Sequence, residues 1–392
     1  MKKMTLTVAM LLSATYLFAQ NNVSEATQNA DFSKSVITQT GQDHFSKVTQ
    51  NSNANNALKE NLATVTQLNL GGAHGNESSI VQGGNTHTST VTQIGDNKAR
   101  VYIGGLLTAN SASSVAKNVD NETSVVQTGT GNEGAQSIYR AISTNTFLDL
   151  VQVGTGNVSV QVALNSIDSE GKVVQGTTNN DASQTIEGTN EYASILQVGS
   201  NNQAIQVIEG INSANNDNYI TQTGSDNFAG IKTIGGDNFF RVTQTGDRNT
   251  LEGFSDELGI QDGDRNEARF LQTGNDNTFV VSQVGNDNTI EGYGITAGLG
   301  ANQLGNRNIA SISQDGDDNL SQSLQKGSDN TIDLTQTGDD NTSVVRQYTG
   351  LFSSANRNNA DITQSGMGNS SNVNQNGNNN SVVVTQTGGM MP

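Results

Sequence analysis

Glutamine and asparagine side chains that recur on a fixed spacing are the residues with the most chemistry to offer in this chain. Gln314, Gln325, Gln336 and Gln347 follow one another at intervals of eleven residues, and the first three each open the phrase Gln-x-Gly-x-x-Asn. A primary amide has two N–H donors and a carbonyl acceptor, so amides stacked in register can donate to one neighbour and accept from the other. The spacing therefore predicts Gln and Asn ladders between stacked strands.

The elements that would hold these amides are short strands joined by tight turns. Apolar residues lie mostly two and four places before each Gln, as Ile332 and Leu334 do before Gln336, and this period of two is typical of a strand. The Gly and the Asp/Asn-rich residues that follow suit a turn with positive φ. Two such units make one flat rung of about 22 residues. The sequence thus predicts an all-β fold, a β-solenoid or cross-β stack of about fifteen strand-turn-strand rungs.

Both amides of each phrase are expected to point inward, between the two strands of a rung. Gln shares a strand face with the apolar residues two and four places before it, and a buried amide is costly unless it is hydrogen-bonded. An in-register ladder satisfies it. The predicted stacking ladder consists of Gln222, Asn227, Gln244, Asn249, Gln272, Asn277, Gln283, Asn288, Gln303, Asn308, Gln314, Asn319, Gln325, Asn330, Gln336, Asn341, Gln364, Asn369, Gln375 and Asn380.

Composition agrees with a polar stack and excludes several classes of protein. Only 32% of the 392 residues are hydrophobic, there is no Trp, and the single Pro is the last residue, Pro392, so backbone donors remain available for ladders. No Cys is present, which excludes disulfides and thiol chemistry. A formal net charge of -18 disfavours nucleic acid as a partner.

The chain divides into four segments. Residues 1–19, with Lys2 and Lys3 before an apolar run, are typical of a cleaved export signal, and no later segment is long and apolar enough to span a membrane. Residues 20–126 carry irregular repeats, and 222–392 carry regular ones. Residues 127–221 carry variant repeats, in which a second Gln follows nine residues after the first. These second glutamines are Gln136, Gln161, Gln184 and Gln206.

Three irregularities interrupt the pattern. The stretch Lys98 to Asn121 contains no Gln phrase, and we interpret it as one degenerate rung or an insertion. Longer gaps around Glu252 to Leu258, Glu291 to Gly298 and Thr349 to Ser354 indicate insertions, which we place at turns because loop closure costs grow slowly with length. In the variant repeats the half-rung is expected to slip by two residues.

The turn residue just before each Asn often carries charge. With alternate half-repeats taken from Gln222, one edge reads Asp226, Arg248, Asp276, Arg307, Asp329, and the other reads Asp237, Arg265, Asp287, Asp318, Asp340. The first edge alternates in sign. One hypothesis is that this order relieves repulsion between turns about 4.7 to 4.8 Å apart; chance placement of soluble turn residues is the alternative.

The repeated Gln-x-Gly-x-x-Asn, ending a strand-turn-strand of about 22 residues, resembles the curlin repeat of curli fibre subunits. The family's stacking residues map onto Gln244 with Asn249, Gln272 with Asn277, Gln283 with Asn288, Gln314 with Asn319, Gln325 with Asn330 and Gln336 with Asn341. The resemblance implies a bacterial functional amyloid that is secreted unfolded and polymerises on the cell surface into biofilm matrix. It also implies as partners further copies of the chain, a nucleator or major subunit, periplasmic chaperones and an outer-membrane secretion pore.

The rival functions are an enzyme and a monomeric binding solenoid. His44, His74 and His87 are scattered without a carboxylate partner at a meaningful spacing, so we expect no catalytic, cofactor or metal residues and place the histidines in ordinary turns or loops. Asp pairs such as Asp317-Asp318 and Asp339-Asp340 leave a calcium-binding β-roll as an alternative. Thr residues that flank the ladder Gln leave ice binding as another.

Overall fold

The computed structural model describes residues 21–29, 33–51, 61–69, 75–84, 86–104, 120–139, 143–253, 258–292, 301–348 and 355–388. The predicted export signal, residues 1–19, lies outside them. The chain forms two compact units, which meet in sequence between Asn165 and Ser166. The described residues hold strands and turns, and they include no helix that could cross a membrane.

The strands of the two units are short and closely spaced in sequence. The first unit contains β1 (Val23–Asn29), β2 (Lys34–Thr40), β3 (Phe45–Asn51), β4 (Leu62–Leu68), β5 (Glu77–Gly83), β6 (Thr88–Gly104), β7 (Glu122–Tyr139), β8 (Phe147–Thr155) and most of β9 (Val158–Ile167). The second contains β10 (Glu170–Thr178), β11 (Asp181–Thr189), β12 (Tyr192–Ser200), β13 (Gln203–Ala214), β14 (Asp217–Ser225), β15 (Phe228–Gly236), β16 (Phe239–Thr245), β17 (Thr250–Glu252), β18 (Gly259–Asp262), β19 (Glu267–Thr273), β20 (Thr278–Val284), β21 (Thr289–Gly292), β22 (Ala301–Asn306), β23 (Ile309–Asp315), β24 (Leu320–Ser328), β25 (Thr331–Thr337), β26 (Thr342–Tyr348), β27 (Ala355–Asn356), β28 (Asn359–Ser365), β29 (Ser370–Asn376) and β30 (Ser381–Thr387).

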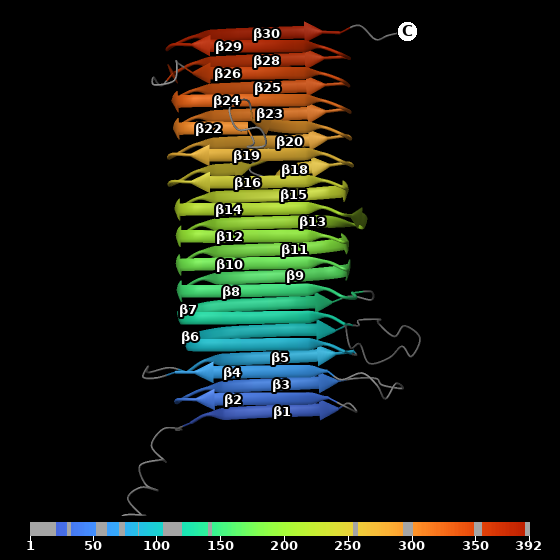
Figure 1. Cartoon of the computed structure of the whole chain (residues 1–392), viewed down its shortest axis with the longest axis vertical. Coiled ribbons are helices and arrows are strands. Elements are labelled where there is room, and N and C mark those ends of the chain that lie inside the picture. The colour runs from blue at the N-terminus through green and yellow to red at the C-terminus, as the bar shows by residue number, and fades with distance from the viewer. Residues whose placement is uncertain are drawn as a thin grey trace, which may run out of the picture. The chain divides into compact units, whose positions relative to one another are not determined.

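Within each unit the strands stack in parallel, each paired with the strand one coil further along the chain (Figure 1). β14 pairs with β16 so that Gln222 lies opposite Gln244, and β23 pairs with β25 so that Gln314 lies opposite Gln336. Both offsets are 22 residues. Each unit is therefore a β-solenoid built from coils of two strands and two turns, which confirms the predicted fold class.

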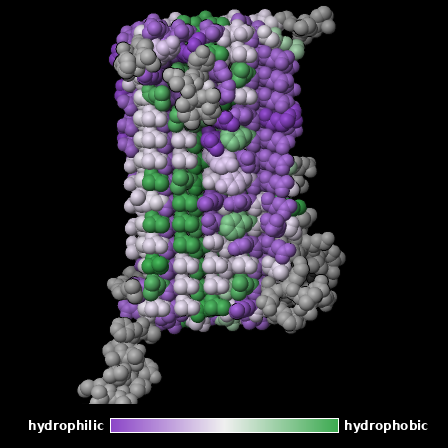
Figure 2. All heavy atoms as spheres, in the orientation of Figure 1, coloured by the Kyte–Doolittle hydropathy of each residue, from purple (hydrophilic) through white to green (hydrophobic). Residues whose placement is uncertain are grey.

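The core of each coil is thin and partly polar. Burial alternates along most interior strands, and the inward apolar side chains, such as Val65 and Ile332, are fully buried. Phe270 contacts Phe240 and Phe279, with ring centroids 5.7 and 5.0 Å apart. Figure 2 shows that the outer surface is mainly hydrophilic or neutral, with apolar columns among the polar ones. A coil buries too few apolar groups to hold together alone, so neighbouring coils must stabilise it.

The turns require glycine at one position and a left-handed residue at another. Gly246 has a φ of 114°, and a Cβ on it would lie 2.1 Å from the carbonyl oxygen of Gly274 in the next coil. Two residues later Arg248 has a φ of 55°, and its counterpart Asp276 has one of 58°. The first position excludes every side chain by close approach, whereas the second only needs tolerance of positive φ.

Two of the three predicted insertions do not lie at turns. β17 and β18 both pair with β20, so the insertion between them interrupts a strand, and β21 and β22 both pair with β24 in the same way. Each half keeps its register on the intact strand of the next coil, which is why the stack tolerates the interruption. The third insertion, whose residues 349–354 lie outside the described part, separates β26 from β27, and both of these pair with β24; β27 does so at Gly327 and Ser328, where the turn begins.

Of the two interpretations of residues 98–121, the degenerate rung fits the first part. Lys98 to Ile103 continue β6 and pair in register with both β5 and β7. Val101 occupies the position opposite Gln136. An apolar residue fits a strand position facing the core, but without the Gln phrase the sequence pattern gave no signal for it.

The variant repeats do not slip either. From Gln203 to Glu209, β13 pairs with β15 without a shift, with Gln206 opposite Ile231 and Ile208 opposite Thr233; the register shifts only after Glu209. The amide and the apolar residue have exchanged places along an unshifted strand, because a slip would break the parallel hydrogen-bond ladder.

The close approach at the turns predicts unequal costs for two glycine substitutions in adjacent coils. Gly338→Ala places a Cβ 2.4 Å from the carbonyl oxygen of Gly366, whereas a Cβ on Gly368, with a φ of 68°, meets nothing within 4 Å. We expect Gly368→Ala to cost about 1 to 2 kcal/mol of unfolding free energy, from φ alone, and Gly338→Ala to cost at least about 2 kcal/mol more. Urea denaturation of both variants measures this, and equal losses would contradict the assigned turn geometry.

Candidate functional site: stacked amide ladders

The predicted glutamines of the second unit form two continuous columns of hydrogen bonds. In each column the Nε2 of one Gln donates to the Oε1 of the Gln in the next coil, at distances between 2.7 and 3.1 Å. One column contains Gln175, Gln197, Gln222, Gln244, Gln272, Gln303, Gln325, Gln347 and Gln375. The other contains Gln261, Gln283, Gln314, Gln336, Gln364 and Gln386. Glutamines inside the columns are fully buried.

The second N–H of each amide crosses the interior of the coil. Gln244 Nε2 donates to the backbone oxygen of Phe228 at 2.9 Å, and Gln314 Nε2 to that of Thr289 at 3.1 Å. A ladder glutamine therefore joins its own coil to the next and also links the two strands of its coil. Both of its N–H donors and its carbonyl acceptor are used, so its burial leaves no polar group unpaired.

The first unit contains the same columns in shorter form. Gln28, Gln50 and Gln82 make one, and Gln39, Gln67, Gln93, Gln127 and Gln152 make another. The second glutamines of the variant repeats are also buried and pair as Gln136 with Gln161 and Gln184 with Gln206. The oxygens of Gln136 and Gln261 have no hydrogen-bond partner among the described residues, because Val101 and Thr233 lie opposite them in the coil before.

The asparagine columns run in the opposite direction. Asn249 donates from its backbone N and from Nδ2 to the Oδ1 of Asn227, at 3.0 and 3.1 Å, so the bond points toward the preceding coil. The same contact joins Asn277 to Asn249. The columns are Asn180, Asn202, Asn227, Asn249, Asn277, Asn308, Asn330, Asn358, Asn380 and Asn216, Asn238, Asn266, Asn288, Asn319, Asn341, Asn369. All twenty predicted stacking residues thus lie in buried or end-coil ladder positions.

A third kind of column was not found from the sequence. The residue after the turn glycine is Asp or Asn in most coils, and its Oδ1 accepts a hydrogen bond from the backbone N of the equivalent residue in the preceding coil. Examples are Asp247 to Asn275 and Asp317 to Asp339, at 2.9 and 3.0 Å. The sequence signal is the repeated Asp or Asn after Gly, which turn propensity alone also explains. The carboxylate and amide oxygens of these residues act as acceptors between coils.

The charged turn residues form the columns predicted from the sequence. Arg248 makes a two-pronged contact with Asp276, at 2.6 and 3.0 Å, and Arg307 makes one with Asp329. Arg265 pairs with Asp287 on the other edge. Hydrogen bonds from these arginines hold the pKa of each Asp carboxyl below its usual value. Alternating charge therefore links the turns of adjacent coils, and Arg357 continues the first column beyond the predicted set.

Two histidines occupy asparagine positions of the first unit. The backbone N of His44 donates to Asn22 Oδ1, and its Nδ1 accepts from the backbone N of Asn76 at 3.1 Å. His87 occupies the equivalent position, and its backbone N donates to Asn61 Oδ1. Its side chain is fully buried, and burial lowers its pKa to about 4. His87 lies between β5 and β6, as predicted for a turn residue, but it is buried in a ladder position, and His74 lies outside the described residues. Because its charged form is disfavoured, His87 contributes stability above about pH 6.5 that is lost as the pH falls toward 4.

Glu191 replaces an asparagine of the second unit. It is 1% exposed; Oε1 accepts from Ser213 Oγ at 2.7 Å and Oε2 from the backbone N of Asn216 at 2.9 Å. Burial raises its pKa to about 7, although these hydrogen bonds lower it. The ladder thus tolerates a carboxyl in place of an amide. At neutral pH the charged form of this carboxyl is partly desolvated, which is unfavourable.

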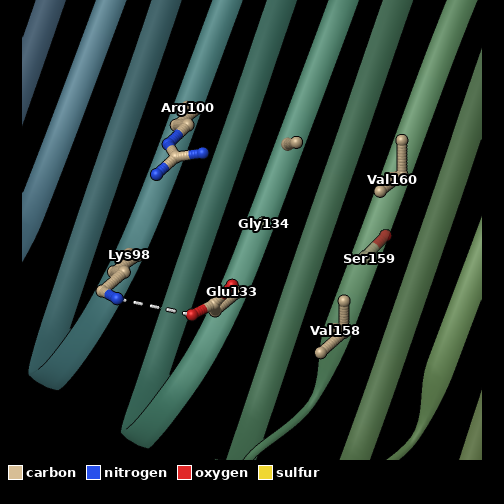
Figure 3. Close-up of a pocket in the computed structure, with 8 residues that line it drawn as sticks. Lys98, Arg100, Glu133, Gly134, Val158, Ser159 and Val160 are labelled. Carbon is tan, nitrogen blue, oxygen red and sulfur yellow. Dashed lines mark ion pairs between the residues drawn. The ribbon is translucent and has the colours of Figure 1, made fainter.

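The described residues offer little else that could do chemistry. No group of three or more His, Asp or Glu among them is placed to hold a metal ion. A shallow depression of about 190 Å³ lies on the outer face of the first unit, where Lys98 and Glu133 form an ion pair of 3.5 Å beside Val158 and Val160 (Figure 3). Its charged side chains are Lys98 and Arg100 on β6 and Glu133 on β7, and its lining contains no histidine and no second carboxylate.

One family model matches the repeats of this chain. Residues 214–246, 260–285, 327–351 and 355–388 match the family model of the curlin associated repeat. No curated protein matches the chain. All four matching segments belong to the second unit, and each contains Gln and Asn of the columns described above.

The bond geometry predicts that a ladder glutamine cannot be replaced by its isostere. Gln314→Glu removes the donor to Gln336 Oε1 and to the backbone oxygen of Thr289, and leaves a buried carboxylate. We expect a loss of about 2 to 5 kcal/mol in unfolding free energy at neutral pH. Gln203→Glu, on an exposed side chain, is the matched control and should change stability by less than about 0.5 kcal/mol. Equal stabilities in urea denaturation would refute the ladder assignment.

Glu191 predicts a specific pH dependence. Its pKa is about 7 in the fold against 4.5 as the ordinary value, so folding is favoured by protonation. The stabilising effect is complete below about pH 4.5 and is lost as the pH rises toward 7, on the order of 3 kcal/mol in total. Glu191→Asn restores the amide, and its advantage over the natural chain should grow through this window.

Denaturation curves at several pH values measure that advantage. Glu122→Gln, which changes an exposed carboxyl at the start of β7, controls for net charge. A pH-independent difference between the natural chain and Glu191→Asn would show that Glu191 does not titrate in this range.

Proposed function

We propose, on the premise that this chain is a curlin-repeat protein, that it is a secreted structural subunit which self-assembles into extracellular amyloid fibres. Each coil already repeats the geometry of the next, with parallel strands in register and amide columns along the stack. A fibre of stacked copies would extend the same contacts without a new kind of interface.

The observation that carries the proposal is the condition of the first and last coils. Inward apolar residues of interior coils, such as Ile332 and Ile362, are at most 1% exposed. Their equivalents in β30, Val382 and Val384, are only half-buried, and all of β1 whose side chains are described is exposed. Soluble solenoids normally cover such ends with polar caps, because an open strand edge is a template for pairing. Here the first and last described coils present ladder residues, Gln28 and Gln386.

The setting and partners follow from the family. Curlin repeats are associated with curli fibres, so we propose a cell-surface location on a bacterium with an outer membrane, and a role in biofilm matrix and surface adhesion. The expected partners are a nucleator or major subunit, periplasmic chaperones and a secretion pore. Residues 1–19 would direct export.

Assembly from denaturant tests the proposal. Residues 20–392, diluted out of guanidinium, should form fibres that bind thioflavin, seed fresh monomer and give a reflection at about 4.7 to 4.8 Å along the fibre axis. A stable monomeric β-rich protein that seeds nothing would contradict it.

Ice binding is the second candidate, and one observation favours it. Ser282, Ser313, Thr335, Thr363 and Thr385 follow one another on the outer face of successive coils, forming a row of hydroxyls. Thermal hysteresis in a solution of the monomer would support this function, and its absence would remove it. Calcium binding gains no such support, because Asp317 and Asp339 each accept a hydrogen bond from the preceding coil.

A further inference from the structure

Two arginines of the second unit face outward at the same position of neighbouring coils. Arg241 of β16 lies opposite Arg269 of β19 in the parallel register. Arg241 is exposed and Arg269 is half-buried. Like charges directly opposite each other on paired strands are destabilising, and the chain as a whole is acidic, with a formal net charge of -18. A local arrangement that costs stability is typical of a functional site.

Aromatic rings, rather than a carboxylate, hold the guanidinium of Arg241. Its Cζ lies 5.1 Å from the ring centroid of Tyr219 and 5.3 Å from that of Phe239. The Cζ of Arg269 lies 4.9 Å from the same Phe239 centroid. A ring attracts a positive charge through its face, but it does not use the fork of N–H donors that binds an oxoanion. Arg241 makes no ion pair with a described residue, so its charge is available to a ligand.

The charge of Arg269 is only partly neutralised. Its Nε lies 2.9 Å from Glu267 Oε1, but the two atoms are not aligned for a hydrogen bond. The rings therefore bring together one free guanidinium and one partly paired guanidinium on adjacent coils. Such a pair of planar forks can bind one oxoanion from two sides.

A row of aromatic rings extends from the arginines along the stack. The ring centroids of Tyr192 and Tyr219 are 5.2 Å apart, and those of Tyr219 and Phe239 are 5.7 Å apart. These three residues come from β12, β14 and β16 and are half-buried. Thr221 and Thr243 follow on the same outward faces. The surface thus combines apolar ring area with hydroxyl groups and cations.

We propose that this arginine-aromatic surface binds an acidic polysaccharide, with a carboxylate or sulfate group between the two guanidiniums and a sugar ring against the tyrosines. The surface consists of Tyr192, Tyr219, Phe239, Arg241 and Arg269. It lies on the outer face of neighbouring coils within one copy of the chain. Binding therefore does not depend on fibre formation and adds a ligand to the proposed structural role.

The shape and the charge of the surface favour this class of ligand. Sites for small molecules are concave, whereas these residues lie on the outer face of a sheet, which suits an extended polymer. A nucleic acid carries a charge at every nucleotide, and its charges would meet Asp217 and Glu267, which lie on either side of Phe239. A polysaccharide can carry its oxoanions further apart, with uncharged ring surface between them.

Binding of labelled oligosaccharides to immobilised, folded residues 20–392 tests the proposal. The probes are an oligogalacturonate, a sulfated dextran fragment and a neutral dextran fragment of similar length. We expect at least one charged probe to bind and the neutral one not to bind. Arg241→Gln should weaken that binding by about tenfold or more, because it removes charge-assisted hydrogen bonds. Combined with Arg269→Gln, it should abolish binding.

Three further variants separate a built site from general attraction. Arg307→Gln removes the same charge from an exposed arginine that is paired with Asp329 at a turn, and it should leave binding nearly unchanged. Arg241→Lys keeps the charge but loses the planar fork, so it should also bind more weakly. Tyr192→Ala removes ring surface without changing charge and should weaken binding as well. Unchanged far-UV circular dichroism of each variant shows that the coils are folded.

Several results would overturn the proposal. Natural affinity of Arg241→Lys, or equal losses in Arg307→Gln and Arg241→Gln, would mean that charge alone attracts the probes. Equal binding of the neutral dextran would exclude an oxoanion site. A single-stranded oligonucleotide that binds more tightly than both charged saccharides would assign the surface to nucleic acid instead. Absence of binding by both charged probes would remove the proposal, and it would leave the proposed fibre function untouched.

Discussion

A primary amide in the interior of a coil must find a partner for two donors and one acceptor, and the rest of this structure depends on that requirement. An inward Gln meets it in full when another amide lies directly above and below it, which requires parallel strands in register. Register in turn brings turn over turn, so that glycines pack against carbonyl oxygens and Asp or Asn oxygens reach the preceding coil. Apolar contacts fill the remaining interior, but they would tolerate many registers. The amides select one.

Local chemistry was predictable from the sequence because one repeat contains all of it. The phrase Gln-x-Gly-x-x-Asn predicted strand, turn and inward amides, and its spacing predicted which arginines and aspartates lie over one another. The structure confirms the ladders at Gln314 and Asn319 and the ion pair of Arg248 with Asp276. These are short-range consequences of a period that the chain repeats many times.

What the sequence did not predict are features defined by the neighbouring coil. Ile103 lies opposite Gln82, and Glu191 lies in an asparagine position, so neither ladder position holds its usual amide, and only the neighbouring strand reveals this. The insertion between β17 and β18 resembles a long turn in sequence, yet β20 holds both halves in one strand. The direction of the amide bonds was equally hidden, since an amide's composition is the same whichever way it points. Each miss arises from contacts between neighbouring coils.

The substitutions within the ladders set limits on what a stack can absorb. His44 uses its ring nitrogens in place of an amide, and Glu191 keeps two acceptors but adds a charge that burial opposes. Both preserve the backbone register, so the columns continue past them. The amide ladder therefore fixes the register, and a single replacement changes only the hydrogen bonds around it.

Hydrogen exchange of side-chain amides tests this claim most directly. The Nε2 protons of interior ladder glutamines such as Gln283 and Gln314 should exchange as slowly as the backbone amides of their strands, since both are released only when coils separate. Gln203, on the exposed face, should exchange at the rate of a free amide. Exchange of Gln283 and Gln314 as fast as that of Gln203 would contradict the account, because amides open to water could not hold the coils in register.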